Sequence, residues 1–146
     1  MTAPRITGLL ESAIYVDDMA RACAFYRDVL ELAEMLVTPR LTAFDAGAGG
    51  VLLVFARGQS RDDMPGAGGT IPGHDGAGPL HLAFGIPADA APAWRARLDA
   101  AGVAIRSEVT WPRGGISLYV DDPDGHVVEL ATPGLWANDA DRPGAR

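Results

Sequence analysis

Three side chains with metal-ligand chemistry stand in three separate predicted strands: Glu11, His81 and Glu129. Glu129 interrupts the apolar run of residues 126–131, and a carboxylate in mid-strand is costly unless it faces water, a partner or a metal. Two carboxylates and one imidazole suit a hard or borderline divalent cation, with water or substrate completing the coordination. The alternatives are an outward-facing Glu129 on an edge strand, a hydrogen-bonded core histidine at His81, and a pocket acid or salt-bridge partner at Glu11. Without a metal, two nearby carboxylates would raise one another's pKa, and one could act as a general acid or base.

The predicted hairpin that carries Glu129 organises the chain. Residues 116–120 alternate and are rich in β-branched and aromatic side chains, which is typical of a strand. Asp122-Pro123-Asp124-Gly125 is predicted as a tight turn, because proline presets φ and glycine adopts conformations that other residues avoid. Residues 126–131 form the return strand.

A second group of candidate residues lies on this hairpin and on the loop before it: Trp111, Arg113, Ser117 and Tyr119. The indole of Trp111 offers a stacking face and Arg113 a fixed positive charge, which suit an anionic or aromatic ligand. An equally good interpretation is that Trp111 is a structural residue and Arg113 a surface residue, with no ligand.

Length and composition limit the classes of function. The 146 residues suffice for one domain or for two small repeats that share a core, and 48% of them are hydrophobic. We find no apolar run of membrane-spanning length and no signal-peptide pattern. The single cysteine, Cys23, excludes an internal disulfide, is typical of a small core residue and predicts a reducing cytoplasm. The net charge of -7 without a basic cluster argues against nucleic acid or anionic membrane as a partner.

Each half of the chain is predicted as a strand, a helix and three further strands. In the first half these cover residues 9–16, 19–32, 34–38, 41–45 and 51–55, with Asp17 or Asp18 capping the helix. In the second half they cover 80–86, 90–102, 103–109, 116–120 and 126–131, with Asp89 as the cap. Residues 57–79 are rich in glycine and proline and are predicted as a mobile connection, with a lid as one function. The tail starts apolar and is expected to fray at its end.

The two halves match residue by residue. Residues 11–16 correspond to 81–86 with an offset of 70, and 41–55 to 116–130 with an offset of 75 and no gap. A duplicated βαβββ unit predicts an α+β fold whose sheets pair into one curved surface, with helices outside and a cup on the concave side. We expect one domain, with repeats at 9–57 and 80–132, a loop at 58–79 and a tail at 133–146. The alignment makes Glu11 and His81 equivalent and pairs Glu129 with Val54.

The sequence resembles the vicinal oxygen chelate superfamily, also called glyoxalase/bleomycin-resistance/dioxygenase proteins. The resemblance runs from residue 9 to residue 130, through ESAIYVDDMARACAFYRDVLEL, GPLHLAF and SLYVDDPDGHVVEL. It implies paired βαβββ modules, usually a homodimer, and one divalent metal in the cup, with Mn, Ni, Zn, Fe and Mg as the open choices. The family's first ligand is commonly His and sometimes Gln or Glu, which corresponds here to Glu11, and the ligands of the second module match His81 and Glu129. The fourth ligand of glyoxalase I would fall on Val54, which cannot coordinate, so a true glyoxalase I activity is disfavoured.

The resemblance implies a metal-dependent lyase or isomerase that acts on a small oxygen-rich substrate through a stabilised enolate or oxyanion. Glu129 or Glu11 would then move the proton, and Tyr119 would hydrogen-bond a substrate oxygen. One alternative is a bleomycin-resistance-type protein whose acidic dimer cleft sequesters a cationic drug. Another is a metal-dependent thiol transferase or dioxygenase, although Ala13 replaces a threonine of the fosfomycin-resistance transferases and extradiol dioxygenases need two histidines. We expect a homodimer whose modules pair between chains, so that Glu11 of one chain joins His81 and Glu129 of the other.

Overall fold

The computed structural model describes residues 2–145. The first half forms module 1, with β1 (Glu11–Val16), α1 (Met19–Ala24), the π-helical turn η1 (Phe25–Val29), β2 (Ala33–Val37), β3 (Leu41–Asp45) and β4 (Val51–Ala56). The second half forms module 2, with β7 (His81–Gly85), α2 (Ala91–Ala100), β8 (Ser107–Thr110), β9 (Ile116–Asp121) and β10 (Val127–Ala131). The short hairpin of β5 (Met64–Gly66) and β6 (Gly69–Ile71) lies between them, and the 3₁₀ turn η2 (Asp139–Asp141) lies in the tail.

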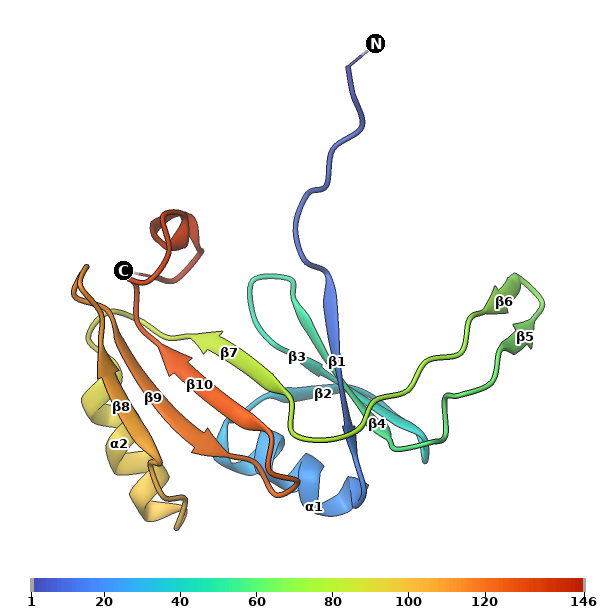
Figure 1. The fold of residues 1–146 in the computed structure, drawn as a ribbon, viewed down its shortest axis with the longest axis horizontal. Helices are drawn as coiled ribbons and strands as arrows, with labels where there is room; N and C mark the ends of the chain where they lie inside the picture. Colours follow the sequence, from blue (N-terminus) through green and yellow to red (C-terminus); the bar gives the residue numbers. More distant parts are fainter. Residues whose placement is uncertain (1, 146) are drawn as a thin grey trace.

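Both modules have the same topology (Figure 1). The strand orders are β1-β4-β3-β2 and β7-β10-β9-β8, and in each module the first strand runs parallel to the last while the other pairs are antiparallel. The predicted α+β class with two βαβββ modules is therefore confirmed. Within residues 2–145 the two four-stranded sheets remain separate, so the cup expected from joining them is not closed inside one chain.

One hydrophobic core joins the modules on their helical side. It contains apolar residues of both helical segments and alternate residues of both sheets, and its largest fully buried members include Tyr26, Phe44, Leu98, Leu118 and Leu130. Cys23 belongs to this core, as predicted. Because alternate strand residues point to opposite faces, the other face of each sheet is free for a site. We call this second face, which carries Glu11 in module 1 and His81 in module 2, the cup face.

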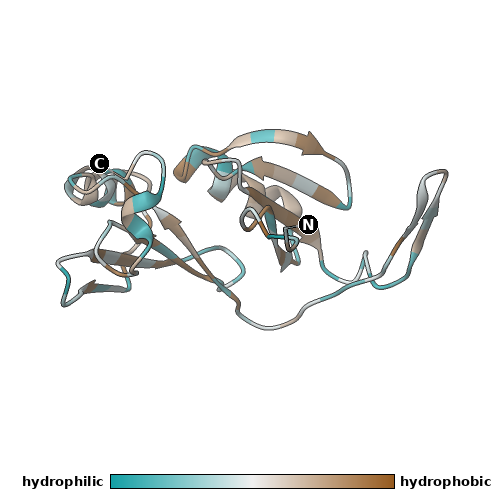
Figure 2. Ribbon diagram, turned by 90° about the horizontal axis from the view of Figure 1, so that it is seen from above, coloured by the Kyte–Doolittle hydropathy of each residue, from teal (hydrophilic) through white to brown (hydrophobic). Residues whose placement is uncertain are grey.

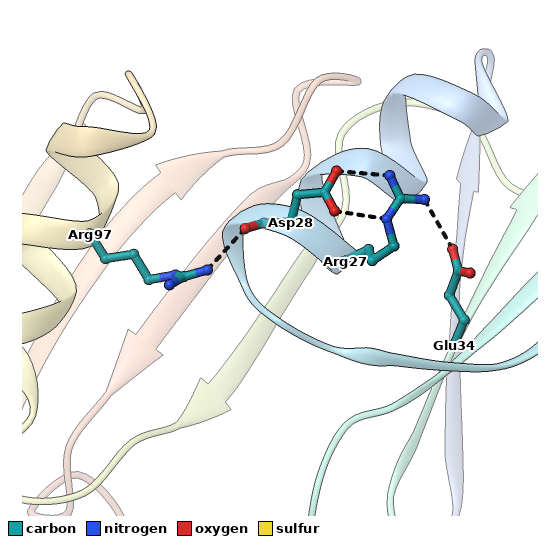
Figure 3. Close-up of polar contacts among 4 residues, drawn as sticks. All are labelled: Arg27, Asp28, Glu34 and Arg97. Atoms are coloured by element: carbon teal, nitrogen blue, oxygen red, sulfur yellow. Dashed lines mark hydrogen bonds and ion pairs between the residues drawn. The ribbon is translucent and has the colours of Figure 1, made fainter.

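Arg97 of α2 fastens module 2 to the end of η1 (Figure 3). Its guanidinium donates a hydrogen bond to the carbonyl oxygen of Asp28 (2.9 Å), which Figure 3 shows. It also donates to the carbonyl oxygen of Val29 (2.6 Å) and forms an ion pair with Glu31 (2.9 Å). Carbonyls at the end of a helix lack helical partners, so this contact satisfies groups that the helix leaves open. Figure 3 also shows Arg27 bridging Asp28 and Glu34 on the surface of module 1.

Asp122 forms a second link between the modules, in the turn that precedes β10. Its carboxylate accepts hydrogen bonds from the Tyr26 hydroxyl (2.7 Å) and from the backbone N–H groups of Asp124 and His126. Burial and this carboxylate raise the pKa of Tyr26 far above its usual value, so the phenol keeps its proton. The predicted Asp-Pro-Asp-Gly turn therefore also anchors the helical segment of module 1.

Several sequence predictions need correction. Asp18 caps α1, but Asp89 caps nothing, because α2 begins one residue later, after Ala90, without a side-chain cap. The first helix is shorter than predicted and ends in η1, and the last strand before the hairpin starts at Ser107 rather than at residue 103. The loop of residues 57–79 contains the β5–β6 hairpin, which projects away from both sheets in Figures 1 and 2. No helix among residues 2–145 has the length and apolarity needed to cross a membrane.

Candidate metal centre

His81 and Glu129 meet on the cup face of module 2. β10 is an interior strand, and Glu129 on it is 5% exposed, which excludes the outward-facing edge glutamate. The Nε2 atom of His81 lies 3.3 Å from Oε2 of Glu129. The other ring nitrogen, Nδ1, lies 3.0 Å from the carbonyl oxygen of Val127, and because a carbonyl only accepts, Nδ1 carries the proton. His81 Nε2 therefore faces a carboxylate oxygen, and the two atoms are placed to share a proton or to bind a metal ion together.

The other oxygen of Glu129, Oε1, accepts a hydrogen bond at the end of a chain that starts at Trp111 and passes through Ser117. The indole N–H of Trp111 donates to Ser117 Oγ (2.8 Å), and the Ser117 hydroxyl donates to Oε1 of Glu129. Ser117 is fully buried. It pairs with Ala131 across β9 and β10, which puts its side chain on the same face of the sheet as the Glu129 carboxylate. Partners of this kind fix the orientation of a metal-binding carboxylate. In this structure Trp111 and Ser117 therefore support Glu129; their predicted contact with substrate stays a prediction.

Tyr119 lies beside Glu129 as its direct cross-strand neighbour on β9. Its ring is 6.4 Å from that of His81, measured between centroids. Burial, and after it the negative charge of Glu129, raise the pKa of Tyr119 above its usual value. The phenol is therefore a hydrogen-bond donor at neutral pH and into the alkaline range.

Glu11 and Arg113 lie apart from this group. Glu11 is exposed on β1 and lines a cavity of about 560 Å³ between the modules together with residues 82–85, whereas neither His81 nor Glu129 lines it. Arg113 is exposed beside the tail, where its charge contributes to lowering the pKa of Asp139. Within residues 2–145, no three acidic, histidine or cysteine side chains gather into a metal site. One chain thus brings together two of the three predicted ligands.

Comparison with known proteins assigns the family. The family model described as Glyoxalase/Bleomycin resistance protein/Dioxygenase superfamily matches residues 8–130. The chain belongs to this superfamily. A crystal structure of lactoylglutathione lyase from Agrobacterium tumefaciens is 33% identical, with a TM-score of 0.82 over 92% of this chain and 99% of that one.

More distant superfamily structures share the fold at lower identity. A fosfomycin resistance protein, FosX, from Listeria monocytogenes is 23% identical, with a TM-score of 0.65 over 90% of this chain and 97% of that one. A point mutant of FosX complexed with Mn(II) and 1S,2S-dihydroxypropylphosphonic acid has a TM-score of 0.62 at 23% identity, over 86% of this chain and 90% of that one.

The strand register corrects which residue of module 1 corresponds to Glu129, the position that the resemblance gives to the fourth ligand of glyoxalase I. Glu129 pairs with Ala83, and the equivalent pair in module 1 is Leu53 with Ala13. Val54 points the other way and is fully buried in the core. The sequence alignment was therefore wrong by one residue over these strands, and the cup-facing counterpart of Glu129 is Leu53. Leucine cannot coordinate either, so the absence of a fourth ligand stands.

Two histidines that the sequence left without a role have clear positions. His126 is fully buried; its Nδ1 accepts from the N–H of Leu80 (2.9 Å) and its Nε2–H donates to the carbonyl of Tyr15 (2.8 Å), so it ties the modules together. His74 hydrogen-bonds the Tyr15 hydroxyl (2.8 Å) and packs edge-on against Phe55, at 4.6 Å between ring centroids. Only the position of His126 directly after the Asp-Pro-Asp-Gly turn could have drawn attention to it; the contact of His74 spans 59 residues and left no local signal.

Proposed function

We propose that this superfamily member is a divalent-metal-dependent lyase or isomerase acting on a small oxygen-rich substrate. The observation that carries the proposal is the approach of His81 Nε2 to Glu129 Oε2, with the imidazole proton already committed to the Val127 carbonyl. One nitrogen and one carboxylate oxygen with free lone pairs fit Mn, Fe, Ni or Zn. The partner subunit's Glu11 would complete the ligand set.

The proposed site needs Glu11 from a second chain, and apolar side chains that are exposed in one chain support such a homodimer. Ile6, Leu9 and Leu10 on the N-terminal arm are 93%, 84% and 68% exposed, and the apolar side chains of β2 and of the β5–β6 hairpin are also exposed. The arm and the hairpin both extend away from the two sheets in Figure 1. Exposed apolar surface of this extent is typical of an interface. Light scattering at micromolar protein should give a dimer, and a monomer would contradict the shared site.

A bound divalent ion would supply Lewis-acid polarisation of the substrate oxygens. The chain supplies the proton transfer and the orientation. Ser117 holds Oε1 of Glu129. Oε2, the oxygen that faces His81, would serve as a ligand and, once the substrate displaces it, would take a proton from a substrate carbon. Tyr119, whose pKa is raised, would donate a hydrogen bond to a substrate oxygen. Glu11 is the alternative base, and a cytoplasmic location remains our prediction.

Equilibrium dialysis against Mn, Ni, Zn, Fe and Mg tests the proposal. We expect one ion per chain, with affinity falling about 10–100-fold or more in His81→Ala and in Glu129→Ala. His74→Ala and Glu108→Ala are matched controls that remove the same side-chain types outside the site. Wild-type protein that takes up none of these ions would overturn the proposal and favour sequestration of a cationic drug. Lactoylglutathione is the first substrate to test, because a relative that is 33% identical is named for it.

A further inference from the structure

The C-terminal tail lies against module 2, where it lines a cavity together with the cup-face residues Gly85, Glu129 and Ala131, and it forms a turn of its own. One oxygen of Asp139 accepts hydrogen bonds from the backbone N–H groups of Gly134 (2.8 Å), Leu135 (2.7 Å) and Trp136 (2.8 Å). These donors, with Trp136 as the largest contributor, lower the pKa of Asp139. Residues 134–139 therefore form a turn that is held by its own hydrogen bonds, and Figure 1 shows the tail beyond the ends of β7 and β10. The fraying expected for the last residues stays a prediction.

The turn places the side chain of Arg142 against Gly85, at the end of β7. A methyl group added at Gly85 would lie 3.0 Å from Cδ and 3.3 Å from Nη1 of Arg142, so the arginine occupies the space that a side chain would need. Among residues 2–145, no ion pair and no side-chain hydrogen bond involves Arg142. The guanidinium of Arg142 thus keeps its five donors available to a ligand.

Arg142 lines two cavities. The smaller one, of about 100 Å³, is also lined by Glu129, Ala131 and Trp136. The larger one, of about 560 Å³, is also lined by Glu11. Arg142 is the cation on the wall of both, in a chain whose net charge is -7. An anion that approached Glu129 without this arginine would meet mainly negative charge.

We propose that Arg142 binds an anionic group of the substrate, a carboxylate or a phosphate or phosphonate, in the cavity that Glu129 lines. The inference rests on the proposed function and narrows its substrate class to small organic acids. The planar fork of a guanidinium pairs with two oxygens of such a group at once. The smaller cavity, of about 100 Å³, is lined by both Arg142 and Glu129, so an anionic group bound by Arg142 would lie close to the oxygens that react beside Glu129.

Anion binding to metal-free protein tests this assignment. Inorganic phosphate and malonate are titrated separately into wild-type protein, with the arginine Nε–H signals followed by NMR and the affinity measured by calorimetry. We expect the Arg142 signal to shift and the affinity for at least one anion to fall about 10-fold or more in Arg142→Gln. The anion that binds more tightly identifies the class of acid.

Two further variants separate charge from position. Gly85→Ala keeps every charge and shifts the Arg142 side chain by only a few tenths of an ångström, so it should weaken anion binding less than Arg142→Gln does. Arg95→Gln removes one arginine from the outer surface of α2, where it pairs with Glu108, and should bind anions like the wild type. Thermal unfolding checks that each variant is folded. Equal affinity in wild type and Arg142→Gln, or no anion binding by the wild type, would overturn the assignment.

The two proposals fail independently. Protein that binds no metal but loses anion affinity in Arg142→Gln would refute the metal-dependent function and retain the anion site. Protein that binds metal through His81 and Glu129, but whose wild type and Arg142→Gln variant bind anions equally well, would refute the anion site and retain the metal-dependent function.

Discussion

Module 1 and module 2 share strand order and register, so each cup-facing residue of one has a counterpart in the other. Where module 2 has Glu129, Tyr119 and Ser117, module 1 has Leu53, Ala43 and Leu41. Two pairs of counterparts are polar in both modules: Glu11 with His81, and Asp45 with Asp121 at the ends of β3 and β9. The same strand arrangement is therefore polar at its centre in module 2 and apolar at its centre in module 1.

The segments that follow the modules also correspond. The loop after module 1 brings His74 and Gly76 onto Tyr15, and a methyl group at Gly76 would collide with the Tyr15 ring. The tail after module 2 brings Arg142 onto Gly85, the counterpart of Tyr15. At this position in module 1, the rings of Tyr15, Phe55 and His74 pack together. At the equivalent position in module 2, the side chain of Arg142 lies against Gly85 and its N–H groups are available to a ligand.

The largest effect should come from testing the register itself. Val54→Glu places a carboxylate in the core and should destabilise the fold by about 4 kcal/mol or more, because a buried unpaired charge is among the costliest changes. Leu53→Glu places the same group on the cup face and should cost only about 1–2 kcal/mol. Urea unfolding measures both, and equal costs would show that the register is wrong.

Metal affinity should rise when the glutamate of module 2, Glu129, is copied to the equivalent position of module 1, Leu53. In the proposed dimer, Leu53→Glu adds a fourth ligand beside Glu11, and we expect the metal to bind on the order of 10-fold more tightly, about 1.4 kcal/mol. Dialysis of Leu53→Glu against Leu53→Gln, which has the same shape without the charge, measures the gain. No difference between the two would place Leu53 away from the metal.

Catalysis should depend on Glu129 more than on its neighbours. We expect Glu129→Gln to stay folded and lose most turnover on a verified substrate, and Tyr119→Phe to lose less, because it removes one hydrogen bond and no charge. Steady-state kinetics with circular dichroism as the folding control makes the comparison. Wild-type turnover in Glu129→Gln would move the base to Glu11.

The smallest effect concerns the tyrosines. The pKa of Tyr119 and that of Tyr15 are both raised, each chiefly by burial, with Glu129 adding to the first and Asp75 to the second. A raised pKa in the folded state means that this contribution to stability is complete below about pH 10 and is lost as the pH rises through the folded value. Absorbance titration at alkaline pH should show Glu129→Gln lowering one midpoint, whereas Asp75→Asn lowers another. An unchanged titration in Glu129→Gln would separate Tyr119 from Glu129.

The fold followed from the sequence because its signals are local. Alternation in residues 116–120 and the Asp-Pro-Asp-Gly turn both depend on neighbours in the chain, and each matches an element. The pairing of Glu129 with Val54 went wrong because a one-residue shift leaves an apolar strand looking the same while it reverses every side chain. Arg142 was not foreseen, since it reaches Gly85 across 57 residues through a turn set by Asp139.

Two copies of the chain must share each metal site if the proposed function holds, and mixing two defective variants tests this requirement. Glu11→Gln and Glu129→Ala should each bind little metal alone. When they are unfolded together and refolded, half of the dimers combine the two variants, and each such dimer has one site with Glu11, His81 and Glu129 all intact. We predict that the mixture recovers about one quarter of the wild-type metal stoichiometry, with the wild-type affinity. No recovery, in a mixture shown to contain mixed dimers, would contradict a site shared between copies.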